Sequence, residues 1–118
     1  MAGMSAMHFP EVYRGWFSVC GVNYYERIQD PEKPEGYRWS AFTPPTRKRM
    51  LNARQHTRAV LLTGEKDFNR LQTRVFRDRF LEDGFRHVLY LEVPEMAHAV
   101  PIEGDWFARA LEFMESRD

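Results

Sequence analysis

The sequence predicts an α/β fold built on about three parallel strands. Short apolar runs alternate with segments whose apolar residues recur at helical spacing, and Gly64 and Pro94 close the two clearest runs. These runs contain few polar positions, as strands do when helices cover both faces of a sheet. Strands separated by helices pair in parallel through right-handed crossovers. We therefore expect residues 1–118 to belong to one domain with three parallel strands and flanking helices.

The first part of the chain is predicted to hold a helix, a strand and a long loop. Residues 2–9 (AGMSAMHF) are small and apolar and stop at Pro10, which indicates the last turns of a packed helix. Residues 15–22 (GWFSVCGV) are a short apolar run that favours a buried strand. Residues 24–45 are rich in Pro, Glu, Gly and aromatic side chains, which is typical of a long loop.

The remaining elements alternate regularly. Thr46 is a suitable N-cap for a basic helix, which leads into the apolar strand 59–63. Residues 69–83 place their apolar side chains on one broad face, as an amphipathic helix does. A second clear strand covers 87–93, and the final helix carries an apolar face that includes Trp106.

The composition excludes several classes of partner. Lys plus Arg and Asp plus Glu both number 17, so the formal charge is zero and no overall field favours nucleic acid or an anionic membrane. No apolar run approaches the roughly 20 residues that span a bilayer. Cys20 is the one cysteine, so no disulfide within the chain and no cysteine-based metal motif is expected, and we expect no cofactor. The expected compartment is the cytoplasm, and a targeting segment upstream of Met1 stays an open alternative.

Two polar residues follow the two clearest strands. Asp67 comes directly after the first of these strands, and His98 lies in the loop after the second. Ligands of open parallel sheets bind beyond the carboxyl ends of the strands, so these side chains are expected at one edge. An acid that holds Nδ1–H of a histidine, while Nε2 takes a proton from a nucleophile, is the acid and base pair of a catalytic triad. The alternatives are that Asp67 caps the next helix and that His98 is an ordinary loop residue.

Three segments of the chain resemble a known enzyme family. The segments FPEVYRGWFSVCGVN, RAVLLTGEKDFN and HVLYLEVPEMAHAVP resemble the C-terminal half of α/β-hydrolases of the serine esterase type. Among these, they are similar to polyhydroxybutyrate depolymerases and feruloyl esterases. The likeness covers nearly the whole chain outside the loop 24–45. It implies a partial α/β-hydrolase fold in which the G-x-x-D pattern ending at Asp67 carries the triad acid and His98 is the base. It also implies a small carboxylic ester as substrate, cleaved through an acyl-enzyme.

The nucleophile of that family is absent from the sequence. It lies in a G-x-S-x-G elbow, and none of the chain's four serines occupies such a motif: Ser5, Ser18, Ser40 and Ser116. The resemblance therefore implies that the N-terminal half with the elbow is missing, as in a truncated gene model or a fragment. The chain alone is expected to be inactive, and its expected partner is the missing half or a second copy.

Two other functions are compatible with the pattern. A genuine short protein would be a non-catalytic module that binds another chain along an exposed sheet edge. A flavodoxin-like protein is less favoured because no phosphate-binding loop is present. Cys20 is expected to be a buried strand residue. The aromatic residues of the long loop could either line a pocket or anchor the loop to the core: Tyr24, Tyr25, Tyr37, Trp39 and Phe42.

Structural or solvated roles are expected for the other histidines and the basic stretch: His8, His56 and His87, and Arg47, Lys48, Arg49, Arg54 and Arg58.

Overall fold

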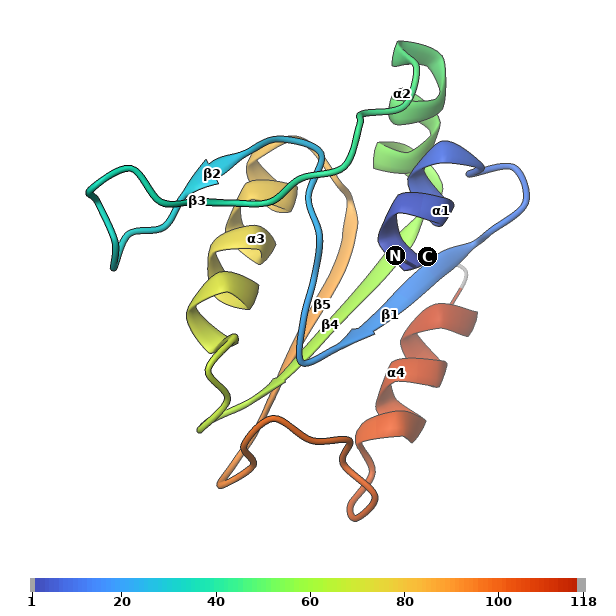
Figure 1. Cartoon of the computed structure of the whole chain (residues 1–118). Helices are drawn as coiled ribbons and strands as arrows, with labels where there is room; N and C mark the ends of the chain where they lie inside the picture. The colour runs from blue at the N-terminus through green and yellow to red at the C-terminus, as the bar shows by residue number, and fades with distance from the viewer. Residues whose placement is uncertain (1, 117–118) are drawn as a thin grey trace.

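The computed structural model, which describes residues 2–116, contains a parallel three-stranded sheet (Figure 1). Its strands are β1 (Gly15–Val19), β4 (Arg58–Gly64) and β5 (His87–Val93), in the spatial order β1-β4-β5. The predicted α/β fold with three parallel strands is confirmed. The predicted long loop holds a small antiparallel pair, β2 (Ile28–Gln29) and β3 (Arg38–Trp39).

In the described part of the chain, four helices flank the sheet, near the positions that the sequence predicts. They are α1 (Ala2–His8), α2 (Arg47–His56), α3 (Arg70–Glu82) and α4 (Trp106–Glu115). The Thr46 hydroxyl accepts the backbone N–H of Arg49 at 3.4 Å, so Thr46 caps α2 as predicted. No helix within residues 2–116 combines the length and the apolar character needed to cross a membrane.

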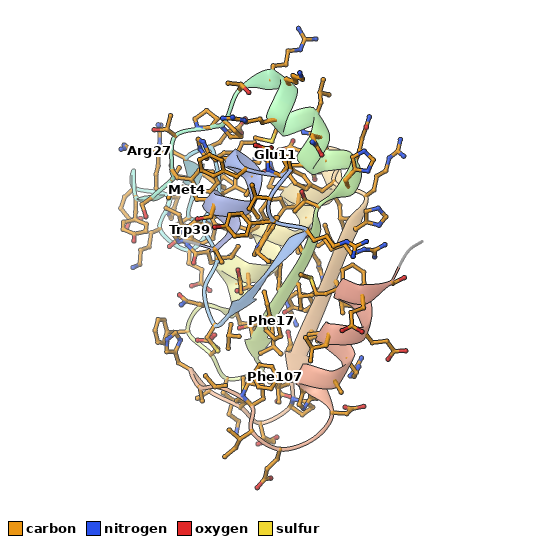
Figure 2. All side chains as sticks on the ribbon, turned by 90° about the vertical axis from the view of Figure 1, so that its right-hand side faces the viewer. Met4, Glu11, Phe17, Arg27, Trp39 and Phe107 are labelled. Atoms are coloured by element: carbon orange, nitrogen blue, oxygen red, sulfur yellow. The ribbon has the colours of Figure 1, made fainter. Side chains whose placement is uncertain are left out.

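The helices form two layers, one on each face of the sheet. Successive side chains of a strand point to opposite faces, so Ala59 and Leu61 pack with α1 and α3, while Val60 and Leu62 pack towards α4. Figure 1 shows α3 on one side of the sheet and α4 on the other. On the α4 side, the rings of Phe17 and Phe107 lie 5.3 Å apart (Figure 2). This two-layer cover explains why the strands are mostly apolar.

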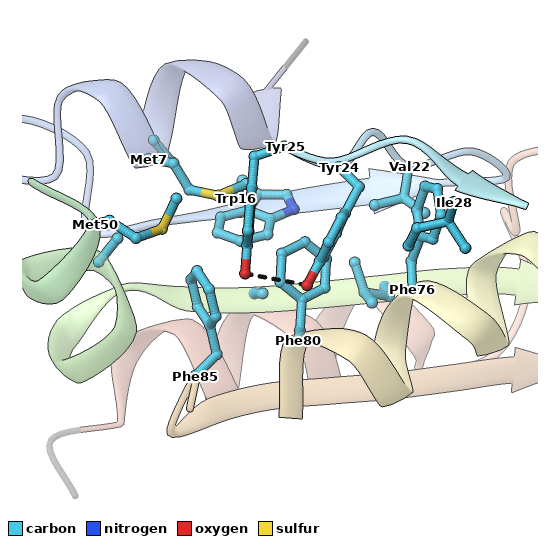
Figure 3. Packing of buried hydrophobic residues seen from close by; sticks show 14 of the residues in the cluster. Met7, Trp16, Val22, Tyr24, Tyr25, Ile28, Met50, Phe76, Phe80 and Phe85 are labelled. Atoms are coloured by element: carbon cyan, nitrogen blue, oxygen red, sulfur yellow. Dashed lines mark hydrogen bonds between the residues drawn. The ribbon is translucent and has the colours of Figure 1, made fainter. Parts of the chain in front are cut away.

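The core between the sheet and α3 is aromatic (Figure 3). Tyr24 and Tyr25 are buried and stacked with their centroids 4.2 Å apart, and Tyr24 also contacts Phe76 and Phe80 of α3. Both tyrosine hydroxyls donate to the carboxylate of Asp83, at the end of α3. The aromatic residues at the start of the long loop therefore anchor it to the core.

The first strand is shorter than the sequence predicts. It ends at Val19 instead of reaching residue 22, because Cys20 adopts a left-handed backbone conformation with φ of 55°. The Cys20 N–H still donates to the carbonyl oxygen of Leu62 at 2.8 Å, so the turn begins at the last bond of the ladder. Cys20 is buried as expected, but it lies at the carboxyl edge of the sheet and not within the strand.

Candidate catalytic site

The carboxyl ends of the three parallel strands bring three reactive side chains together. Cys20 follows β1, Asp67 follows β4, and His98 lies in the loop after β5. The strands run in the same direction and end in the lower part of Figure 1. Nδ1 of His98 lies 2.9 Å from Oδ1 of Asp67, so the contact expected from the topology is present.

Gly64 lets the His98 loop lie directly on the end of β4. A Cβ atom at this position would be 2.1 Å from the carbonyl oxygen of Met96 and 2.6 Å from that of Ala97. The N–H of Lys66 donates to the same Met96 oxygen at 2.8 Å, which fixes the loop there. Within the G-x-x-D pattern, the glycine therefore positions the histidine through backbone contact, while the aspartate contacts it directly.

The Asp67 carboxylate is held in one orientation by three donors. Its side chain is fully buried, the Thr63 hydroxyl donates to Oδ2 at 2.8 Å, and the Asn69 N–H donates to Oδ1 at 3.1 Å. Burial opposes ionisation, but the hydrogen bonds from Asn69, His98 and Thr63 outweigh it, so the pKa of Asp67 lies below its ordinary value. The alternative that Asp67 caps α3 is wrong, because the N-cap is Asn69 and no side chain of the described residues caps the helix; Asp67 forms the turn before the helix and contacts His98.

The His98 ring is oriented by two neighbours and is open to solvent on its remaining side. Besides the Asp67 contact, the ring of Phe68 stacks on it at 4.5 Å with an interplanar angle of 21°. The His98 side chain is 48% exposed. Because Nδ1 faces the carboxylate, Nε2 is the nitrogen that can exchange a proton with a reacting group.

Cys20 is the member of this cluster that sequence reasoning missed. Its Sγ lies 3.1 Å from the carbonyl oxygen of Ala99, beyond His98, and the Asn69 side chain donates to the Cys20 carbonyl oxygen at 2.8 Å. Burial raises the pKa of the Cys20 thiol. One atom from each of Cys20, Asp67 and His98 can be chosen so that all three lie within 4.8 Å of one another. The predicted strand 15–22 ran through Cys20, so the sequence held no signal that the thiol lies beyond the carboxyl end of β1.

A hollow of about 360 Å³ lies next to this cluster, between the β2–β3 hairpin and the start of α3. Tyr37, Trp39 and Phe68 contribute to its wall, together with Lys33. The loop aromatics thus serve both roles that the sequence left open, since Trp39 is also buried against Phe76. Phe68 belongs to the wall of the hollow and also stacks on His98.

The remaining histidines lie away from the Asp67–His98 contact. His56 and His87 line a hollow of about 640 Å³ at the amino end of the sheet, with Arg58 and Ser116. Burial and then the Arg58 charge lower the pKa of His87. The ring of His8 at the end of α1 is hydrogen-bonded through Nε2 to the carbonyl oxygen of Thr43 at 2.7 Å.

The other three serines lie in the N-terminal part of the chain, at different places in the fold. Ser5 lies in α1, Ser18 in β1, and Ser40 directly after β3.

Comparison with known proteins yields no relative: no family model, no curated protein and no solved structure matches the chain. The α/β-hydrolase resemblance therefore remains a prediction that rests on the motifs in the sequence.

Proposed function

We propose that this chain is the acid and base portion of a serine hydrolase that cleaves carboxylic esters through an acyl-enzyme. The observation that carries the proposal is the 2.9 Å contact between His98 and Asp67 at the carboxyl edge of a parallel sheet. This edge is where ligands of such sheets bind. The resemblance of the segments around Gly64, Asp67 and His98 to serine esterases supports the same function.

In this mechanism His98 is the proton-transfer residue. Nε2 takes the proton of a serine hydroxyl as that oxygen attacks the ester carbonyl, and it then gives the proton to the leaving alcohol. Asp67 keeps the ring in the tautomer with hydrogen on Nδ1 and stabilises the imidazolium that forms. Its buried, triply hydrogen-bonded carboxylate fits this task because it is ionised and cannot rotate freely.

The proposal requires a nucleophile and oxyanion-hole donors from residues outside the 118. None of the chain's serines has the elbow motif that presents such a nucleophile. The 118-residue chain alone should therefore not form a covalent adduct with a fluorophosphonate. We also propose a reducing compartment such as the cytoplasm, because one cysteine cannot form a disulfide within the chain.

The experiment begins by reading the gene upstream of the Met1 codon for an in-frame G-x-S-x-G motif. The longer product is then expressed, and hydrolysis of a short acyl ester is measured. Asp67→Asn should lower kcat by roughly 10⁴-fold and His98→Gln by roughly 10⁶-fold, the losses found for the acid and the base of a triad. His87→Gln, which alters a histidine at the other end of the sheet, is the matched control and should keep full activity. Full hydrolysis by the His98→Gln product would overturn the proposal.

A second candidate is a non-catalytic assembly module, which two surface observations favour. Within the described residues, β1 is paired on one side only, by β4, so its other edge is open to a further strand. Phe9, Val12 and Tyr13, which lie between α1 and β1, are large apolar side chains that are at least 47% exposed. Sedimentation of the purified chain tests this function, because a strict monomer at high concentration would contradict self-assembly.

A further inference from the structure

The cluster of Cys20, Asp67 and His98 contains a reactive group, the thiol, that the proposed hydrolase does not use. A serine hydrolase uses the carboxylate and the imidazole, but it has no use for a thiol beside them. A sulfur, a carboxylate oxygen and a ring nitrogen, one from each residue, lie within 4.8 Å of one another. The three residues follow three different strands, so they are brought together by the fold and are not part of one local sequence motif.

Cys20 is held in this position at a conformational cost. Its φ of 55° is in the left-handed region, which non-glycine residues seldom adopt. Its N–H donates to Leu62 and its carbonyl oxygen accepts from Asn69, both at 2.8 Å, so the backbone is fixed on both sides. Strained backbone that is fixed in this way occurs most often at sites of function.

We propose that Cys20, Asp67 and His98 bind a divalent thiophilic cation, with Zn²⁺ as the best match. Thiolate, imidazole and carboxylate are the ligands that Zn²⁺ takes in proteins, whereas Mg²⁺ and Ca²⁺ prefer oxygen alone. Three protein ligands leave the fourth tetrahedral position to water. Zinc bond lengths place ligand atoms roughly 3.3 to 3.6 Å apart. Separations in the cluster that approach 4.8 Å must therefore shorten by up to about 1.5 Å, while the 2.9 Å contact between Nδ1 and Oδ1 must lengthen by about 0.4 Å.

Binding changes the protons of the cluster in a defined way. The Cys20 thiol, which lies against the Ala99 carbonyl oxygen at 3.1 Å, loses its proton to solvent and turns its sulfur to the ion. When the cation binds Nδ1 of His98, the proton that this nitrogen shares with Asp67 moves to Nε2 by exchange with solvent; Nε2 can then no longer accept a proton, so metal binding and proton transfer by His98 exclude each other. The inference does not rest on the proposed hydrolase, because each of the two can hold without the other.

The test titrates the reduced 118-residue chain with Co²⁺, a spectroscopic substitute for Zn²⁺. Cobalt bound to a thiolate has a charge-transfer band in the near ultraviolet, and Cys20 is the one cysteine that can produce it. We expect the band to saturate at one equivalent, independently of protein concentration, and to disappear when Zn²⁺ is added. Zn²⁺ affinity is measured in parallel by competition with a chelating dye.

Three variants separate a three-ligand site from a thiol that binds metal alone. Cys20→Ser should abolish the band, and His98→Gln should weaken binding by about tenfold or more, since loss of even an outer partner of a ligand costs roughly 10- to 100-fold. His98 is half exposed in a loop, so its substitution leaves the core intact. His87→Gln is the control and should bind as the unaltered chain does. No band in excess Co²⁺, or a band unchanged by His98→Gln, would overturn the inference.

Discussion

Gly64→Ala tests whether backbone contact between the two loops positions His98. The added methyl carbon would lie 2.1 Å from the Met96 oxygen and 2.6 Å from the Ala97 oxygen, so the loop before His98 must move by more than 1 Å to reach ordinary van der Waals separation. Overpacking of this kind costs about 1 to 3 kcal/mol, offset by up to about 1 kcal/mol from reduced freedom of the unfolded chain. We expect a net loss of about 1 to 2 kcal/mol, which for 118 residues lowers Tm by roughly 4 to 8 °C.

The assay combines thermal unfolding with the proton NMR signal of the His98 Nδ1–H. That proton is protected while it bonds to Asp67, so Gly64→Ala should broaden or remove its signal. Gly15→Ala is a matched control because its Cβ would lie 2.2 Å from the Arg58 oxygen, at the amino end of the sheet. It should lower Tm while it leaves the His98 signal in place. A Gly64→Ala chain with unchanged Tm and an unchanged His98 signal would refute the reasoning.

Three further outcomes follow from the core and from the buried thiol. Burial and then Asp83 raise the pKa of Tyr25 to about 12, above the unfolded value near 10, so its stabilising effect is complete below pH 10 and is lost as pH rises through 12. Between pH 10 and 12 the free energy of unfolding, measured in urea, should fall by about 1.4 kcal/mol per pH unit because of this group. Tyr25→Phe should reduce that dependence on pH. Phe76→Ala, at a fully buried ring, should cost about 3 to 5 kcal/mol in urea unfolding, whereas Leu111→Ala, at a 58% exposed side chain, should stay within about 0.5. Cys20 should react slowly with a disulfide reagent in the native chain and rapidly in urea, and equal rates would contradict its burial.

The regular elements could be predicted from sequence because each carries a local signal. The apolar run closed by Gly64 forms β4, and the amphipathic segment 69–83 forms α3. A strand buried on both faces has consecutive apolar residues, whereas a helix buried on one face has apolar residues every three or four positions. The predicted end of β1 was wrong because residue type gives no signal for the left-handed turn at Cys20. The apolar pattern of the sequence continues through Cys20, although the backbone leaves the strand there.

The candidate site could be predicted only in part, for a related reason. Asp67 and His98 follow the two clearest strands, so the topology alone places them at one edge. The place of Cys20 in the site was missed because the predicted strand continued to residue 22 and so included Cys20. The anchoring roles of Tyr24 and Tyr25 depend on Asp83, which is distant in sequence, and no local pattern links them.

The separation of these three residues along the chain also governs when the site can form. The Asp67 and His98 contact closes a span of 31 residues, and the contact between Cys20 and Ala99 closes one of 79. Contacts between residues so far apart in sequence form slowly, because the chain loses loop-closure entropy before the contacts can stabilise it. We therefore expect the cluster to form late in folding, and we expect a transient opening of β5 to take His98 out of it. Amide exchange at residues 96–99 should report the completeness of folding more sensitively than helix content does.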